Sequence, residues 1–203
     1  MYKVFIYNKP IYFIDDNEIK EKDISHETYL CENENDRKRI LSIHLASNAT
    51  RPIFVRHQNI KKLMKVFFGD YKKVKAAGGV VLNKKEEILF IERLGYWDLP
   101  KGKVEKKEGL KIAAIREVEE ECSISSPVIE RKLLKTYHTY TIKNREYFKT
   151  THWYLMAYEG NEELVPQQEE GITKVQWVNK EKMEEQVANT YSSIMDVLNS
   201  YLR

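Results

Sequence analysis

Residues 102–124 read Gly-Lys-Val-Glu-Lys-Lys-Glu-Gly-Leu-Lys-Ile-Ala-Ala-Ile-Arg-Glu-Val-Glu-Glu-Glu-Cys-Ser-Ile, and the stretch predicts a helix over residues 109–121. Four carboxylates crowd its second half: Glu117, Glu119, Glu120 and Glu121. A helix C-terminus carries partial negative charge and favours cations, and like charges four residues apart repel each other. We therefore expect a compensating cation, and a divalent metal ion is the first candidate.

The spacing places Glu117, Glu120 and Glu121 on one face of this helix. Clustered carboxylates supply hard oxygen ligands, which suit Mg²⁺ or Mn²⁺ better than zinc. The competing interpretation is a solvated acidic helix held by structural ion pairs. A longer pattern argues against it: Gly102, five residues, Glu108, seven residues, and then Arg116 directly before Glu117.

With these residues in place, the chain resembles the Nudix hydrolase family, whose signature is Gly-x5-Glu-x7-Arg-Glu-U-x-Glu-Glu-x-Gly-U, with U a bulky aliphatic residue. The matching residues are Gly102, Glu108, Arg116, Glu117, Val118, Glu120, Glu121 and Ile124. Ser123 stands where the family has Gly, at a position suited to a left-handed helix cap, where Ser costs about 1 kcal/mol. The resemblance covers about residues 74–203, and residues 1–73 match no family.

The resemblance implies an α/β (α+β) Nudix fold for residues 74–203, with a mixed β-sheet sandwiched between helices. It implies hydrolysis of a diphosphate (pyrophosphate) linkage in a nucleoside diphosphate derivative by metal-assisted attack of water. The implied metal ligands for Mg²⁺ or Mn²⁺ are Glu117, Glu120, Glu121 and the carbonyl of Gly102. Arg116 and Glu108 complete the implied catalytic set as orienting partners of Glu117 and Glu120.

Other residues are candidates for substrate contacts. The candidates for contacts to phosphate oxygens are Arg93, Lys101 and Lys103. The alternative is that they are ordinary charged residues of the surface. Those for stacking a base are Trp97, Tyr137 and Tyr140, with core packing as the alternative. Family analogy suggests Glu169 or Glu170 as a separate general base, against the alternative of solvated loop carboxylates. His138 is either a substrate contact or a half-buried strand residue.

The substrate is open at this stage. Residues 99–103, Leu-Pro-Lys-Gly-Lys, look most like the diadenosine polyphosphate and diphosphoinositol polyphosphate branch of the family. We expect a dinucleoside polyphosphate first, with ADP-ribose or an oxidised nucleotide as alternatives. A different class of function is a Nudix-like ligand-sensing or RNA-binding regulatory module. The intact glutamates argue against that role, and residues 1–73 lack a helix-turn-helix or an aromatic RNA-binding pattern.

Composition is that of a globular protein, with 42% hydrophobic and 32% charged residues among 203. No apolar run approaches the roughly 20 residues that span a bilayer. Cys31 and Cys122 lie far apart, so we expect no disulfide and a cytoplasmic protein. The net charge of +3 gives little support for a nucleic-acid partner.

Two domains are expected, with the boundary near residues 70–74. Residues 1–73 predict a small α+β domain, which could serve as a lid or a homodimer arm. Its expected elements are a hairpin of residues 2–7 and 11–14 turned at 8–10, helices 36–46 and 58–68, and a strand at 52–55. The second domain predicts strands 75–82, 87–93, 132–142, 146–158 and 174–178, a loop from 94 to 108, and one closing helix over 180–202.

Overall fold

The structure, a computed structural model, describes residues 1–18, 27–47 and 52–202. It divides into two compact units: the first holds Met1–Lys73 and Tyr137–Phe148, and the second holds Val74–Thr136 and Lys149–Arg203. The inclusion of residues 137–148 in the first unit differs from the expected division at residue 73. No helix within the described ranges is long and apolar enough to cross a membrane.

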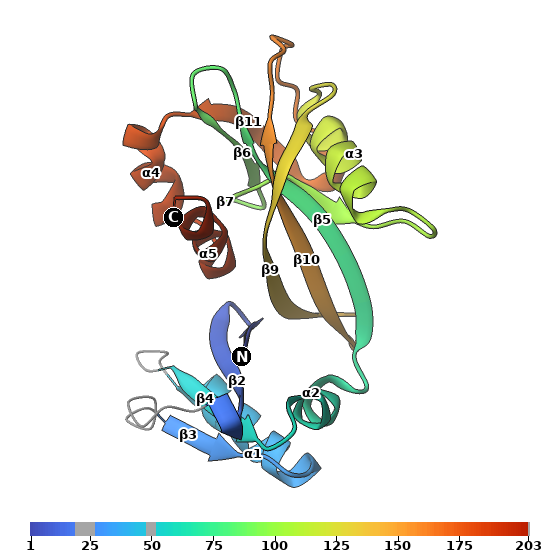
Figure 1. Cartoon of the computed structure of the whole chain (residues 1–203), viewed down its shortest axis with the longest axis vertical. Helices are drawn as coiled ribbons and strands as arrows, with labels where there is room; N and C mark the ends of the chain where they lie inside the picture. The colour runs from blue at the N-terminus through green and yellow to red at the C-terminus, as the bar shows by residue number, and fades with distance from the viewer. Residues whose placement is uncertain (19–26, 48–51, 203) are drawn as a thin grey trace. The chain divides into compact units, whose positions relative to one another are not determined.

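The first unit is a small sheet with two helices (Figure 1). Its elements are β1 (Tyr2–Ile6), β2 (Lys9–Asp15), η1 (Asp16–Glu18), β3 (Glu27–Leu30), α1 (Glu34–Ala46), β4 (Ile53–His57) and α2 (Ile60–Phe68). β1 and β2 are antiparallel, whereas β4 lies parallel to both β2 and β3. The strand β3 was not expected from the sequence.

The hairpin turn between β1 and β2 is Tyr7–Asn8, not residues 8–10. Both turn residues have positive φ, 51° and 61°, as a two-residue turn matched to the strand twist requires. Lys9 and Pro10 are therefore strand residues, and Pro10 lies opposite Phe5. The expected turn lies one residue too late, because Pro is typical of turns but can also stand at the beginning of a strand.

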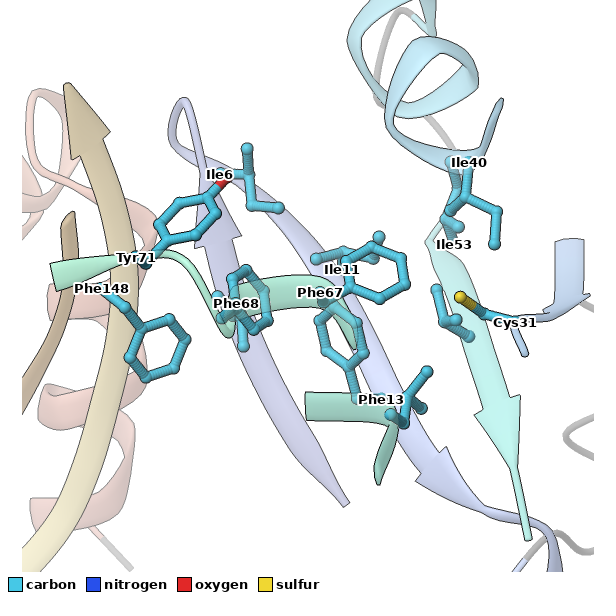
Figure 2. Packing of buried hydrophobic residues seen from close by; sticks show 13 residues of the cluster. Ile6, Ile11, Phe13, Cys31, Ile40, Ile53, Phe67, Phe68, Tyr71 and Phe148 are labelled. Atoms are coloured by element: carbon cyan, nitrogen blue, oxygen red, sulfur yellow. The ribbon is translucent and has the colours of Figure 1, made fainter. Parts of the chain in front are cut away.

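Figure 2 shows the aromatic core of this unit. Within the unit, α2 packs on β2 and β4. The rings of Phe13 and Phe67 lie 4.8 Å apart, and those of Phe68 and Phe148 lie 4.7 Å apart. Phe148 belongs to the β9–β10 hairpin, so its burial here explains why the hairpin tip, residues 137–148, is part of the first unit. Tyr71 donates a hydrogen bond to Glu146 at 2.9 Å and also holds this tip.

The second unit has a sheet with strand order β11-β6-β5-β10-β9, to which β7 and β8 are added. Its elements are β5 (Lys72–Leu82), β6 (Ile88–Arg93), β7 (Tyr96–Asp98), β8 (Lys101–Lys103), α3 (Leu110–Cys122), β9 (Val128–Ile142), β10 (Arg145–Ala157), η3 (Gln168–Glu170), β11 (Ile172–Val178), η4 (Lys180–Lys182), α4 (Met183–Ala188) and α5 (Ser192–Tyr201).

Helices cover both faces of this sheet (Figure 1). On one face α3 packs through Ala113, Ala114 and Val118. The small alanines let the helix lie close to the sheet, which fixes the position of its acidic side. On the other face α5 packs through apolar residues that include Ile194 and Val197. The expected mixed α/β fold, with a sheet between helices, is confirmed.

Two expectations for this unit were wrong. The loop from residue 94 to residue 108 contains the short strands β7 and β8. The closing helix is broken after Ala188, because Asn189 and Thr190 bind β7 instead of extending a helix. The Asn189 side chain donates to the Gly95 carbonyl at 2.7 Å, and the Thr190 hydroxyl donates to the Trp97 carbonyl at 2.6 Å. Side chains of this kind compete with helical hydrogen bonding.

Candidate active site

The helix α3 ends at Ser123, directly after the turn that carries the acidic side chains. Ser123 has φ 55° and ψ 38°, the left-handed conformation, and its N–H donates to the Glu119 carbonyl at 2.9 Å. This backbone conformation is the one expected for the family's glycine at this position. A serine therefore closes the helix in the same way, at a steric cost that glycine does not have.

Arg116 is the centre of an ionic network on α3. Its Nε and Nη2 donate to the two oxygens of Glu108 at 2.8 and 3.0 Å. Its Nη1 lies 2.8 Å from Glu120 and 2.9 Å from Glu117, and Nη2 also donates to the Lys103 carbonyl. The hydrogen bonds from Arg116 hold the pKa of Glu108 below its ordinary value. The guanidinium thus links α3 to Glu108 and to the end of β8.

Glu117 lies directly against Gly102 on β8. A Cβ on Gly102 would lie 1.8 Å from the Oε2 atom of Glu117, so the Glu117 carboxylate would have to move. Glycine at this position therefore leaves room for the Glu117 carboxylate, which any larger residue would displace. Burial raises the pKa of Glu117, while the neighbouring Arg116 opposes this shift.

Glu121 is the most deeply placed carboxylate of the cluster, with 1% of its surface exposed. Its Oε2 accepts a hydrogen bond from the backbone N–H of Lys101 at 2.8 Å, and Arg93 lies 3.9 Å from its Oε1. Burial raises the pKa of Glu121 to about 7, against the opposing effect of Lys101. A buried carboxylate of this kind favours a proton or a cation as its partner.

The side chain of Lys101 is buried in an ion pair with Asp98. Lys101 Nζ lies 2.7 Å from Asp98 Oδ2, and the two residues are 8% and 4% exposed. Burial by itself would lower the pKa of Lys101, but Asp98 and Glu121 raise it above its ordinary value. Asp98 also accepts from the Leu99 N–H at 2.8 Å. This pair holds the turn between β7 and β8, and thereby the backbone N–H that contacts Glu121.

A polar cleft of about 640 Å³ opens in front of the glutamates. It brings together residues of β6, β8, α3 and β10 that are far apart in the sequence. Its lining is Arg93, Lys101, Gly102, Lys103, Val104, Glu105, Lys106, Arg116, Glu117, Glu120, Glu121, Lys149, Gln167 and Glu170. The cleft therefore has acidic residues from one helix and basic residues from several strands.

Several candidates from the sequence lie in this cleft, and others do not line it. Arg93 and Glu170 both line the cleft, and Arg93 donates a hydrogen bond to Glu170 at 2.9 Å, whereas Glu169 does not line it. Trp97 does not line it either, and Lys174 lies 5.8 Å from the centre of its ring.

The remaining aromatic candidates belong to the first unit. The ring of Tyr140 stacks on that of Tyr147 at 5.1 Å. Tyr137 packs against the core of that unit, and its ring lies 5.4 Å from that of Tyr2. His138 lies next to it on β9 and pairs with Phe5.

Two residues of the site have no signal in the sequence. Asp98 lies within residues 94–108, which the sequence predicts as a loop, and its pairing with Lys101 depends on the turn between β7 and β8. Lys149 lines the cleft from β10, and burial together with the nearby Lys101 lowers its pKa to about 8. In the sequence, a single lysine in a Tyr/Thr-rich strand cannot be told from an ordinary surface residue. The pairing of β10 in the sheet brings this lysine to the cleft.

The donor set suits a hard divalent cation, but the side chains bind other partners here. In the described part of the chain, no three His, Cys, Asp or Glu side chains are arranged to hold a metal ion together. Glu117 and Glu120 both bind Arg116 Nη1, and Glu121 binds the Lys101 N–H. Three carboxylates that line one cleft nevertheless offer the oxygen ligands and the negative charge that Mg²⁺ or Mn²⁺ needs.

Comparisons with known proteins find a matching family model and several similar structures. A family model described as NUDIX domain matches residues 72–198. A MutT protein from Methanosarcina mazei Go1 is similar, with 22% identity and a TM-score of 0.50 over 66% of this chain and 96% of that chain. An Ap4A hydrolase from C. elegans in a binary complex has 23% identity and a TM-score of 0.49, over 64% of this chain and 95% of that one. A MutT NUDIX hydrolase from Burkholderia pseudomallei has 20% identity and a TM-score of 0.49, over 64% and 98%.

Proposed function

This chain belongs to the NUDIX-domain family, and on that premise we propose that it hydrolyses a diphosphate linkage in a nucleoside diphosphate derivative. One observation carries the proposal. Glu117, Glu120 and Glu121 of α3 line a single cleft together with basic side chains of β6, β8 and β10. A diphosphate is shielded by its negative oxygens, so its hydrolysis needs both a cation to neutralise them and groups that position the chain.

The chemistry of the carboxylates supports a bound divalent cation, Mg²⁺ or Mn²⁺, as the cofactor. Glu117, Glu120 and Glu121 would hold it, with the carbonyl of Gly102 as a further ligand. When bound, such an ion neutralises phosphoryl oxygens and lowers the pKa of a coordinated water. Binding would compete with Arg116 for Glu117 and Glu120, and the two bonds to Glu108 would keep the guanidinium nearby.

The protein's own groups would orient the substrate and accept a proton. Arg93 and Lys103 are the proposed contacts for phosphate oxygens, and Lys101 contributes positive charge from its buried pair with Asp98. Glu170 is the better placed of the two loop carboxylates to act as a general base, because it lines the cleft and Glu169 does not. Trp97 and Tyr140 remain proposals for base contacts.

A dinucleoside polyphosphate is the substrate that we propose first. Support comes from residues 99–103, which end in Lys-Gly-Lys, and from the number of basic side chains in the cleft. A longer phosphate chain carries more negative charge and gains more from such a cleft. ADP-ribose and oxidised nucleoside triphosphates carry the same linkage and are the competing substrates.

The test is hydrolysis by the purified full chain with Mg²⁺ or Mn²⁺. Diadenosine tetraphosphate, ADP-ribose, 8-oxo-dGTP, NADH and a capped RNA would be compared, with products separated by chromatography. Glu120→Gln and Glu121→Gln should lower kcat by at least 100-fold, since each removes a proposed metal ligand.

Glu119→Gln is the matched control. It neutralises a glutamate of the same helix that accepts from the Ser126 N–H and does not line the cleft. This variant should keep nearly full activity. The proposal fails if no compound is cleaved, or if all three variants lose activity equally.

A further inference from the structure

Lys149 differs from Arg93, Lys101 and Arg116, the other basic cleft residues that are buried or half-buried, because its charge has no partner among the described residues. Arg116 binds Glu108, Glu117 and Glu120. Arg93 binds Glu170, and Lys101 binds Asp98. Within the described ranges, Lys149 has neither a hydrogen bond nor an ion pair of its side chain.

The surroundings of Lys149 make an unpartnered ammonium costly. The residue is half-buried on β10, and Lys101 and Arg93 add like charge nearby. The neighbouring acids Asp98 and Glu121 oppose this effect, but both already have other partners. A desolvated cation among other cations is unfavourable unless an anion joins it.

The strand that carries Lys149 gives it a defined position. β10 lies between β5 and β9 in the sheet. The residues on either side of Lys149 are held in place, since Phe148 is buried and Thr150 belongs to the strand. A lysine ammonium presents three donors and one compact charge. It therefore suits the oxygens of a phosphate group without requiring a single orientation.

We infer that Lys149 is a substrate-binding residue whose ammonium binds the phosphate chain of the substrate. The inference rests on the proposed function and deepens it: the carboxylates of α3 would hold the cation, and Lys149 would bind phosphoryl oxygens directly from β10. The bound phosphate chain would then supply the negative charge that pairs with the Lys149 ammonium. Such binding holds the ground state and the transition state alike, so its loss should raise KM more than it lowers kcat.

The first experiment measures binding without hydrolysis. Inorganic pyrophosphate is titrated into the full chain by calorimetry in the absence of divalent metal, with wild type, Lys149→Met and Lys149→Arg. We expect Lys149→Met to weaken pyrophosphate binding by at least 10-fold and Lys149→Arg to retain most of it. Lys135→Met is the matched control, because Lys135 is an exposed lysine of the neighbouring strand β9 that does not line the cleft.

The second experiment uses whichever substrate the wild type cleaves. Lys149→Met should raise KM by about 10-fold with a change in kcat of less than 3-fold. Equal pyrophosphate affinity in wild type and Lys149→Met overturns the inference, and so does an equal loss in Lys135→Met or an absence of pyrophosphate binding by wild type. If wild type binds pyrophosphate through Lys149 but cleaves no compound, the proposed hydrolysis fails while the anion site stands. Thermal melting of each variant shows that it is folded, and Lys149→Met should melt no lower than wild type.

Discussion

The Oε2 atom of Glu117 occupies the place where any residue other than glycine at position 102 would carry its Cβ, at a distance of 1.8 Å. This contact joins the beginning and the middle of the signature stretch, residues 102–124. Gly102 lies on β8 and Glu117 on α3, which makes extensive contacts with that strand. The backbone of β8 thereby sets where the Glu117 carboxylate lies. The position of this proposed metal ligand depends on the absence of a side chain at Gly102.

Gly102→Ala should displace Glu117 and weaken Mn²⁺ binding by at least 10-fold, because the new methyl group and the carboxylate cannot occupy the same space. The free energy of unfolding should fall by less than about 1 kcal/mol, because the carboxylate is the end of a flexible side chain and can move aside. Titration with Mn²⁺ and urea denaturation measure the two effects. Gly109→Ala is the control, since its Cβ would meet only Ile112 at 3.6 Å. Equal effects of the two substitutions would contradict this account.

Ser123→Gly should raise the free energy of unfolding of the second unit by about 1 kcal/mol. Glycine adopts the left-handed conformation at φ 55° without the steric cost that serine meets. Ser123→Ala keeps the Cβ and should give no such gain. Thermal melts of both variants, each compared with wild type, check the difference, and a gain shared by both would point to another cause.

A double-mutant cycle between Arg116→Met and Glu108→Gln should give a coupling energy of about 1 kcal/mol. The pair forms two parallel hydrogen bonds but is partly exposed, which screens its charge. The pair of Lys174 and Glu92, in which the lysine is exposed and one contact of 2.7 Å joins the two, is the control and should give less than about 0.5 kcal/mol. A coupling near zero for both pairs would show that the Arg116 network contributes no stability.

Glu121 should make the metal-free protein less stable as pH rises. Burial raises its pKa to about 7 from an ordinary value of 4.5. Between these values the folded protein keeps a proton that the unfolded chain has lost, so the free energy of unfolding falls as pH increases through this window. The loss amounts to as much as about 3 kcal/mol.

Glu121→Gln removes this titration while its side-chain oxygen can still accept from the Lys101 N–H. In EDTA, the variant should therefore gain stability relative to wild type between pH 4.5 and 7, the window set by the two pKa values. Urea denaturation at a series of pH values measures the difference. A constant difference across the series would mean that the carboxyl group is already ionised at the acid end.

Phe148→Ala should lower the stability of the first unit by about 3 kcal/mol, because its ring fills space beside Phe68 in the aromatic core. Hydrogen exchange should show faster exchange in β1, β2 and α2, with α3 of the second unit unchanged. Tyr147→Ala removes a neighbouring ring that stacks on Tyr140 outside the buried core and should have a smaller effect. Faster exchange in α3 alone would contradict the assignment of the hairpin tip.

The sequence by itself determined the helix that became α3 and its acidic face. The spacing of Glu117, Glu120 and Glu121 on a helix is a local property, as are the pairing of Arg116 with Glu120 and the left-handed end at Ser123. Most strands were also predictable, because their apolar runs and turn residues are contiguous. The errors came where tertiary bonds outweigh local preference, as at Asn189 and Thr190, whose side chains bind β7.

Only the tertiary structure decided what surrounds the glutamates. The approach of Gly102 to Glu117, the burial of Lys101 with Asp98, and the position of Lys149 depend on which strands pair and in which register. The same holds for residues 137–148, which complete the core of the first unit through Phe148. Such contacts join residues that are tens of positions apart, and their free energy comes from burial and strand pairing that no short stretch of sequence contains.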